Sequence, residues 1–184
     1  MSFYSLVIEF PPHIQKKLAI VCFGLAQVQW VEENNFYLPL RQLGDLSSDQ
    51  LEKIKERLAH LFFSPFSLMI STINVDQQKS KGMIWAGAGP SLEAKALIKE
   101  IESLLKGSSI TLPPFSPILK APLGYFNKIS SERLYNYILQ YADFQLDPFE
   151  VVNCSLVCLK RTTKTIYYEV IASFAASSQA YGED

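Results

Sequence analysis

Two short stretches of similar composition carry most of the side chains that suit binding of a phosphate or a base. They span residues 36–44 and 115–124, and both place leucines beside prolines. In a β-strand, residues two apart share a face. The faces expected to be buried carry Leu38, Leu40, Leu119, Ala121 and Leu123. The opposite faces carry Tyr37, Pro39 and Arg41 in the first stretch and Ile118, Lys120 and Pro122 in the second.

We expect these two opposite faces to line one groove. Arg41 and Lys120 would hold a phosphate there, the arginine through its planar fork and the lysine as a point charge. Tyr37 and Tyr125 offer rings on which a base can stack. The alternative for Arg41 is an ion pair with a nearby carboxylate, and the alternative for Lys120 is a position in solvent.

Composition favours one globular domain and excludes several classes of protein. The chain has 184 residues, 48% of them apolar, and a formal net charge of -1, which argues against binding of long double-stranded nucleic acid. Three cysteines at 22, 154 and 158 include no Cys-x-x-Cys pair, so neither a disulfide framework nor a zinc site is expected, and a reduced cytoplasmic location fits best. No Walker loop, dinucleotide fingerprint, signal peptide or membrane span is recognisable, so we expect no cofactor, no metal and no membrane association.

The order of predicted elements indicates two similar α/β halves. Strands are expected at residues 3–10, 66–75 and 83–88, with a polar loop at 76–82. Helical spacing predicts helices over residues 12–25, 51–62, 92–105 and 131–141, and Ser47 with Gln50 forms a capping-box pattern. Residues 110–112 suggest a short strand, and residues 149–159 and 165–174 suggest a hairpin. We expect one bilobal domain over residues 1–174 and a flexible tail over 175–184.

At this point the sequence resembles the 2H phosphoesterase superfamily, in particular its 2'-5' RNA ligase-like branch. The resemblance covers most of residues 3–174 in the order of the family. It is carried by Val7–Pro12, Trp30-Val31, Leu38, Leu40-Arg41, Leu43-Gly44, Trp85–Gly87, Phe115–Pro117 and Tyr168–Val170. It implies an α+β, bilobal fold with two antiparallel sheets, outer helices and a central groove.

The resemblance also implies two His-x-Thr/Ser motifs that face one another across the groove. One imidazole takes a proton from the attacking hydroxyl while the other gives one to the leaving oxygen. In this chain the corresponding positions are Tyr37 and Pro39 in the first half and Ile118 and Lys120 in the second. Both motifs therefore read as degenerate, and no catalytic residue of the usual kind is expected.

The two histidines of the chain do not restore the motif. Neither His13 nor His60 is followed two residues later by Ser or Thr, and both fall in predicted helices outside the groove. We therefore expect them to be surface or edge-packed residues rather than a relocated active site.

Three functional hypotheses remain open from the sequence. The first is a catalytically degenerate 2H phosphoesterase-like protein that binds a nucleotide, an RNA end or another phosphate ligand through Tyr37, Arg41, Lys120 and Tyr125. The second is a protein-interaction module in which the groove is closed by its own side chains. The third is an active 2',3'-cyclic phosphodiesterase or RNA ligase-like enzyme with Tyr37 and Lys120 in the acid–base roles. Two basic segments, Lys79–Gly82 and Lys160–Lys164, suit contact with a nucleic-acid backbone, although a solvated turn is the simpler reading of each.

Overall fold

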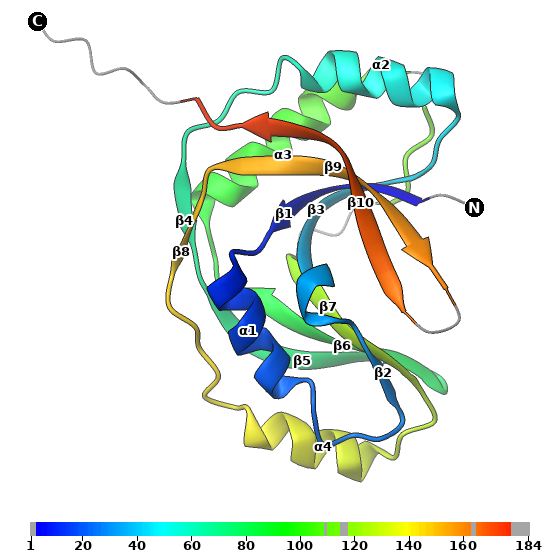
Figure 1. Ribbon diagram of the computed structural model, residues 1–184, viewed down its shortest axis with the longest axis vertical. Helices are drawn as coiled ribbons and strands as arrows, with labels where there is room; N and C mark the ends of the chain where they lie inside the picture. Colours follow the sequence, from blue (N-terminus) through cyan, green and yellow to red (C-terminus); the bar gives the residue numbers. More distant parts are fainter. Residues whose placement is uncertain (1–2, 109, 115–117, 163–164, 178–184) are drawn as a thin grey trace, which may run out of the picture.

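Two four-stranded antiparallel sheets form the framework of the protein in the computed structural model (Figure 1), which describes residues 3–108, 110–114, 118–162 and 165–177. The first sheet contains, in spatial order, β10 (Ile166–Ala175), β9 (Asn153–Arg161), β1 (Phe3–Glu9) and β3 (Tyr37–Asp45). The second contains β2 (Val28–Trp30), β7 (Lys120–Asn127), β6 (Lys81–Ala88) and β5 (Ile70–Gln78). A small third sheet pairs β4 (Phe66–Leu68) with β8 (Phe149–Val151). The α+β fold with two antiparallel sheets that the sequence predicts is therefore confirmed.

The helices pack at the outer ends of the two sheets. α2 (Ser48–Leu58) and α3 (Leu92–Leu105) lie side by side beyond the first sheet, and α4 (Ser131–Gln140) lies against the second (Figure 1). α1 (Pro12–Val21) is tied to α4 because the Tyr137 hydroxyl donates to the Val21 carbonyl at 2.6 Å. A single 3₁₀ turn, η1 (Glu33–Asn35), precedes β3. No helix in the described part of the chain is long and apolar enough to cross a membrane.

Strand alternation buries the predicted core positions. Leu38, Leu40, Ala121 and Leu123 are at most 2% exposed, and Leu119 is also buried. They join one continuous apolar cluster with the inner faces of the helices. On the opposite side of the first sheet, Val7, Tyr37 and Val157 form a separate small cluster.

Helix boundaries follow local capping chemistry. The capping box at the start of α2 is present: the Ser47 hydroxyl accepts from the Gln50 amide N–H, and the Gln50 side chain accepts from the Ser47 N–H. Ser91 caps α3 in the same way through the Ala94 amide. Gly107 follows α3 with φ of +73°, a conformation that favours glycine.

Several predicted boundaries are wrong. The strand expected over residues 66–75 is two strands, β4 and β5, which belong to different sheets, and the run 149–159 is likewise divided into β8 and β9. The polar loop expected at 76–82 is a tight hairpin that turns at Lys79 and Ser80. The first two helices end at Val21 and Leu58, earlier than expected, and residues 110–112 form no strand.

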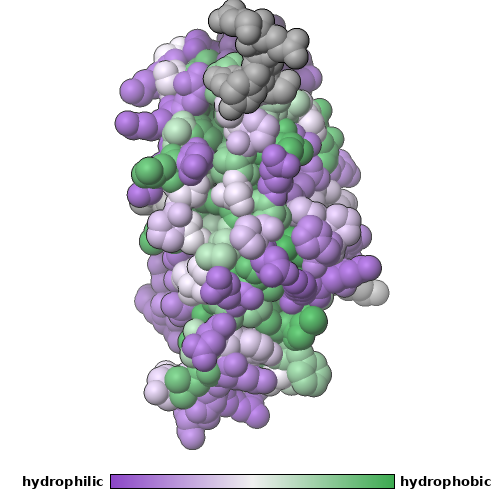
Figure 2. Space-filling model, turned by 90° about the vertical axis from the view of Figure 1, so that its left-hand side faces the viewer, coloured by the Kyte–Doolittle hydropathy of each residue, from purple (hydrophilic) through white to green (hydrophobic). Residues whose placement is uncertain are grey.

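Residues 175–177, the first part of the expected tail, are hydrogen-bonded to the rest of the protein. β10 includes Ala175, and the two following amides are also bonded, Ala176 to the Val152 carbonyl and Ser177 to the Phe63 carbonyl. The rest of the predicted tail, residues 178–184, lies outside the described residues. On the side of the molecule shown in Figure 2, hydrophilic and hydrophobic residues are interspersed.

Candidate functional site

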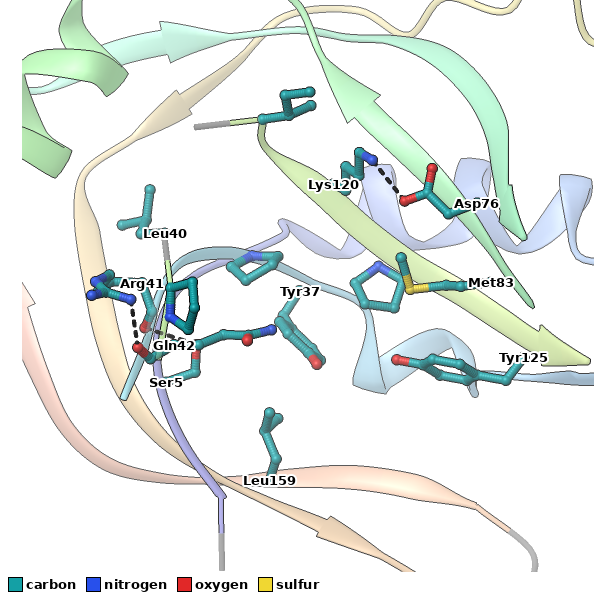
Figure 3. A pocket seen from close by; sticks show the side chains of 14 residues that line it. Ser5, Tyr37, Leu40, Arg41, Gln42, Asp76, Met83, Lys120, Tyr125 and Leu159 are labelled. Carbon is teal, nitrogen blue, oxygen red and sulfur yellow. Dashed lines mark hydrogen bonds and ion pairs between the residues drawn. The ribbon is translucent and has the colours of Figure 1, made fainter. Parts of the chain in front are cut away.

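A groove of about 270 Å³ lies where β3 of the first sheet meets β7 of the second. Its lining includes the six residues predicted from strand alternation, namely Tyr37, Pro39, Arg41, Ile118, Lys120 and Pro122, together with Tyr125. The prediction that the two stretches line one groove is therefore confirmed. The groove is also lined by one carboxylate, two other polar side chains and one thioether, which are those of Asp76, Ser5, Gln42 and Met83 (Figure 3).

Tyr37 is a buried wall of the groove rather than an exposed acid or base. Its side chain is 7% exposed and its ring meets the edge of Tyr168 with centroids 5.7 Å apart. Burial raises the pKa of Tyr37 well above its usual value of 10, and the neighbouring phenols Tyr125 and Tyr168 raise it further. Tyr37 therefore remains a neutral phenol at physiological pH.

Arg41 lines the groove with part of its chain, but its guanidinium is engaged elsewhere. Nε pairs with the carboxylate of Glu102 on α3, and Nη1 donates to the carbonyls of Pro113 at 2.8 Å and Gln42 at 3.1 Å. The residue is only 6% exposed. The ion pair considered as the alternative for Arg41 is thus present. Through these contacts Arg41, in β3, holds both α3 and the backbone at Pro113.

Lys120 also has a partner inside the groove. Its ammonium lies 2.6 Å from Asp76 Oδ2 and 4.6 Å from the centre of the Trp85 ring. The lysine side chain is 22% exposed and that of Asp76 is 48% exposed, so a position in free solvent, the alternative considered for Lys120, is wrong. Figure 3 shows the Arg41 guanidinium directed away from Lys120, so the two cations do not converge on one point.

The indole of Trp85 forms the floor beneath Lys120. It is 9% exposed, and a Cβ on Gly87 would approach its ring at 2.8 Å. Its Nε1 is buried with no hydrogen-bond partner among the described residues. An unpaired buried donor of this kind costs free energy, since it has lost its bond to water.

Tyr125 closes the groove at the other end. In Figure 3 the hydroxyl groups of Tyr37 and Tyr125 point toward one another, with Met83 beside them. Burial raises the pKa of Tyr125, while the guanidinium of Arg161 opposes that effect. That guanidinium lies 5.8 Å from the centre of the Tyr125 ring.

A polar cluster on the groove face of the first sheet was not predicted from the sequence. Glu9 accepts from the Ser155 hydroxyl at 2.6 Å and from the Tyr168 hydroxyl at 3.3 Å, and Ser155 also contacts Ser173 at 3.2 Å. Ser155 is fully buried. The available signal was Glu9 itself, an acid at the end of a mostly apolar strand, because such a residue usually needs partners when it is partly buried.

Neither histidine takes part in the groove. His13 lies in α1 and His60 follows α2; both are exposed and neither is among the lining residues. Within the described ranges, no three His, Cys, Asp or Glu residues gather closely enough to hold a metal ion. The groove therefore offers tyrosines, one lysine and one aspartate as its reactive side chains.

Comparison with solved structures identifies the fold. A structure described as a phosphoesterase superposes with a TM-score of 0.74 at 15% identity, covering 97% of this chain and all of that one. Escherichia coli LigT complexed with 3'-AMP gives 0.74 at 14% identity, covering 96% of this chain and 99% of the other. TT0787 of Thermus thermophilus gives 0.68 at 17% identity over 94% and 97% of the two chains. The predicted 2H phosphoesterase-like fold is thereby confirmed.

Comparison of sequences gives a shorter match. No model of a protein family matches the chain. A curated RNA 2',3'-cyclic phosphodiesterase of Archaeoglobus fulgidus is 27% identical over 84 residues, or 45% of this chain. The match spans 48% of that protein, about half of its length.

Proposed function

We propose that this protein, which has the fold of LigT and the 2H phosphoesterases, is a catalytically degenerate form that binds a nucleotide or an RNA end in the groove between its lobes. The observation that carries the proposal is that Tyr37 and Ile118 line one and the same groove. By the resemblance, these two positions are where the family places its histidines. The fold and the groove are retained while the acid–base pair is replaced.

The replacement residues suit binding better than proton transfer. General acid–base catalysis typically contributes roughly 10²–10⁴-fold to a rate. Ile118 has no proton to give, and the raised pKa of Tyr37 makes it a poor base. The Lys120 ammonium, held by the Asp76 carboxylate, is likewise not an acceptor for a proton.

The same side chains provide contacts for a nucleotide. Tyr125 and Met83 present an aromatic face and a thioether where a base can stack. Lys120 is the cation for a phosphate, once that phosphate takes the place of Asp76. Solved structures of E. coli LigT hold 3'-AMP, NADP+, ATP and phosphate, so nucleotides are the first ligands to examine. In this scheme Arg41 acts by holding the groove wall together.

Thermal-shift and calorimetric titrations with 3'-AMP, ATP and inorganic phosphate test the proposal. A ligand at 100 times its Kd raises the free energy of unfolding by about 2.7 kcal/mol, since it binds only the folded state. We expect Lys120→Gln to weaken binding of each phosphate-bearing ligand. Lys16→Gln, on the exposed face of α1, is the matched control and should bind like the parent protein. Absence of any shift with all three ligands and with a short single-stranded oligoribonucleotide would refute the proposal, and a partner protein blocking the groove would then be the better account.

An active phosphodiesterase is the second candidate, favoured by the match to the A. fulgidus cyclic phosphodiesterase. In that case Tyr37 and Lys120 would take the acid–base roles. Turnover of 2',3'-cyclic nucleotides or 2'-5'-linked dinucleotides that is abolished by Tyr37→Phe or Lys120→Ala would establish it. If the protein binds nucleotides but shows no turnover at high protein concentration, the degenerate binding protein is favoured over the active enzyme.

We also propose a reducing, cytoplasmic location. Cys22, Cys154 and Cys158 are free thiols, and Cys154 and Cys158 are buried. Burial raises the pKa of Cys154 to about 12, so this thiol packs as a neutral apolar group and is poorly reactive. Free buried thiols of this kind are usual in proteins kept in a reduced compartment.

A further inference from the structure

A second hollow of about 310 Å³ adjoins the groove on the far side of Tyr125. It is the continuation of the same face of the second sheet, because Lys81 pairs with Asn127 and Met83 with Tyr125 in the register of β6 and β7. Tyr125 lines both spaces. The polar side chains that line this hollow also include Gln27 and Gln29 at β2 and Arg161 at the end of β9.

The hollow brings together two basic segments that are distant in the sequence. Lys81 is the first residue of β6, directly after the turn from β5, and Arg161 is the last residue of β9, directly before the turn into β10. Taken singly, each segment reads as a solvated turn. Because Lys81 and Arg161 line the same hollow beside the groove, the two segments together present two positive charges to one space.

The charge of this hollow differs from that of the groove. In the groove, Arg41 is paired with Glu102 and Lys120 with Asp76. None of the ion pairs between described residues involves Lys81 or Arg161, and no carboxylate lines the hollow. Its other polar lining side chains are amides, which donate hydrogen bonds to an anion without adding charge.

We propose that this hollow is an anion subsite that takes a backbone phosphate of the same ligand, one nucleotide beyond the groove. The inference rests on the proposed function and narrows it: the ligand is the end of a single-stranded oligonucleotide rather than a free mononucleotide. A base stacked on the groove side of Tyr125 places its neighbouring phosphodiester past the edge of that ring. There the guanidinium of Arg161, already seated over the ring at 5.8 Å, presents its donors.

Salt dependence of oligonucleotide binding tests the subsite. Each phosphate contact on a single strand contributes about -0.7 to the slope of log K against log salt. We compare 3'-AMP with a fluorescein-labelled tetraribonucleotide in fluorescence anisotropy and calorimetry over roughly 50–200 mM salt. The variant Lys81→Gln/Arg161→Gln should lose the one phosphate contact of the hollow, which flattens the slope for the tetranucleotide by about 0.7, and it should weaken binding by about tenfold at low salt.

The controls separate this inference from the proposed function. Lys16→Gln/Arg133→Gln removes the same charges from exposed positions in α1 and α4 and should leave the slope unchanged. 3'-AMP should bind the Lys81→Gln/Arg161→Gln protein, called the hollow variant below, with the same affinity as the parent protein. A tetranucleotide that binds no tighter than 3'-AMP, or an unaltered slope in the hollow variant, overturns the subsite while leaving the groove proposal intact. If binding of the tetranucleotide depends on Lys81 and Arg161 but is unchanged by Lys120→Gln, and 3'-AMP does not bind, the subsite stands and the groove proposal falls. No binding of either RNA ligand would overturn both.

Discussion

Replacing Asp76 with asparagine removes the carboxylate that pairs with Lys120 in the groove. In the parent protein, a phosphate must displace Asp76 from Lys120, whose ammonium lies 2.6 Å from it. The Asp76→Asn variant keeps the shape of the side chain and removes its charge. The amide neither competes for Lys120 as strongly nor repels the phosphate.

The size of the effect follows from the positions of the two groups. A phosphate bound to Lys120 would sit about 6 Å from the former carboxylate, where two unit charges interact by roughly 0.7–1.4 kcal/mol for effective dielectric constants of about 80 to 40. Because Asp76 is 48% exposed, we take a value of about 1 kcal/mol, which corresponds to an affinity increase of about fivefold. The ion pair itself contributes roughly 0–1 kcal/mol to stability. The Tm should therefore fall by no more than about 2–4 °C in a chain of this length.

Calorimetric titration of Asp76→Asn with 3'-AMP and with inorganic phosphate measures the gain. A double-mutant cycle then assigns it to Lys120. Once the lysine is replaced by glutamine, removing the Asp76 charge should no longer help through competition, so the gain in Asp76→Asn/Lys120→Gln should be smaller than in the single variant. Asp143→Asn, an exposed acid after α4, is the matched control and should leave both affinities unchanged.

Weaker binding by Asp76→Asn would refute this reasoning. It would mean that Asp76 orients Lys120 for the ligand rather than competing with it. An equal gain in the presence and absence of Lys120 would show that repulsion between Asp76 and the phosphate accounts for the whole effect, and it would refute competition between Asp76 and the phosphate for Lys120.

Three further predictions concern stability. Ser47→Ala should lower the free energy of unfolding by about 1 kcal/mol in chemical denaturation, because it removes the hydroxyl of the capping box, whereas Ser48→Ala, one residue into α2, should have a much smaller effect. Arg41→Met leaves its three acceptors unpaired and should cost about 2 kcal/mol, while binding of 3'-AMP to the folded variant should persist if the arginine acts only on the groove wall. Burial raises the pKa of Cys154 and, with Glu9 nearby, that of Tyr168, each to about 12. Because the folded protein then holds these protons more tightly than the unfolded chain, stability should be constant at neutral pH and fall as the pH rises from about 9 to 12; a rise over that range in urea titrations would contradict the assignment.

Strand alternation predicted six of the side chains that meet in the groove, although Leu40 and Gln42 from the alternate positions of β3 also line it. The period of two in β3 separates buried Leu38 from Tyr37 on the groove face, and the same rule separates Leu119 from Lys120. These contacts depend on local geometry and on burial of one face, which the sequence encodes directly. Where the pattern is interrupted without a proline or glycine, as between Leu68 and Ile70, the change of sheet left no local signal.

Strand alternation could not predict the carboxylates that pair with Arg41 and Lys120. Glu102 lies 61 residues from Arg41, and Asp76 lies 44 residues from Lys120. Asp76 reads as part of a polar loop because its strand faces solvent and carries glutamines. Which of many surface carboxylates meets a given cation is decided by the packing of whole lobes, and the sequence pattern of one element does not contain it.

These pairings also suggest where binding strength resides along the groove. A phosphate entering between the lobes meets cations whose charge is already balanced by Glu102 and Asp76, so the gain there is only the difference between two partners. Beyond Tyr125, the charges of Lys81 and Arg161 are balanced by no ion pair between described residues, so an anion there need not displace a carboxylate. In a protein that must orient a phosphodiester for cleavage, the strongest contacts belong at the reacting phosphate. In the proposed complex they would lie one nucleotide away, which suits a protein that holds a strand end rather than one that cleaves it.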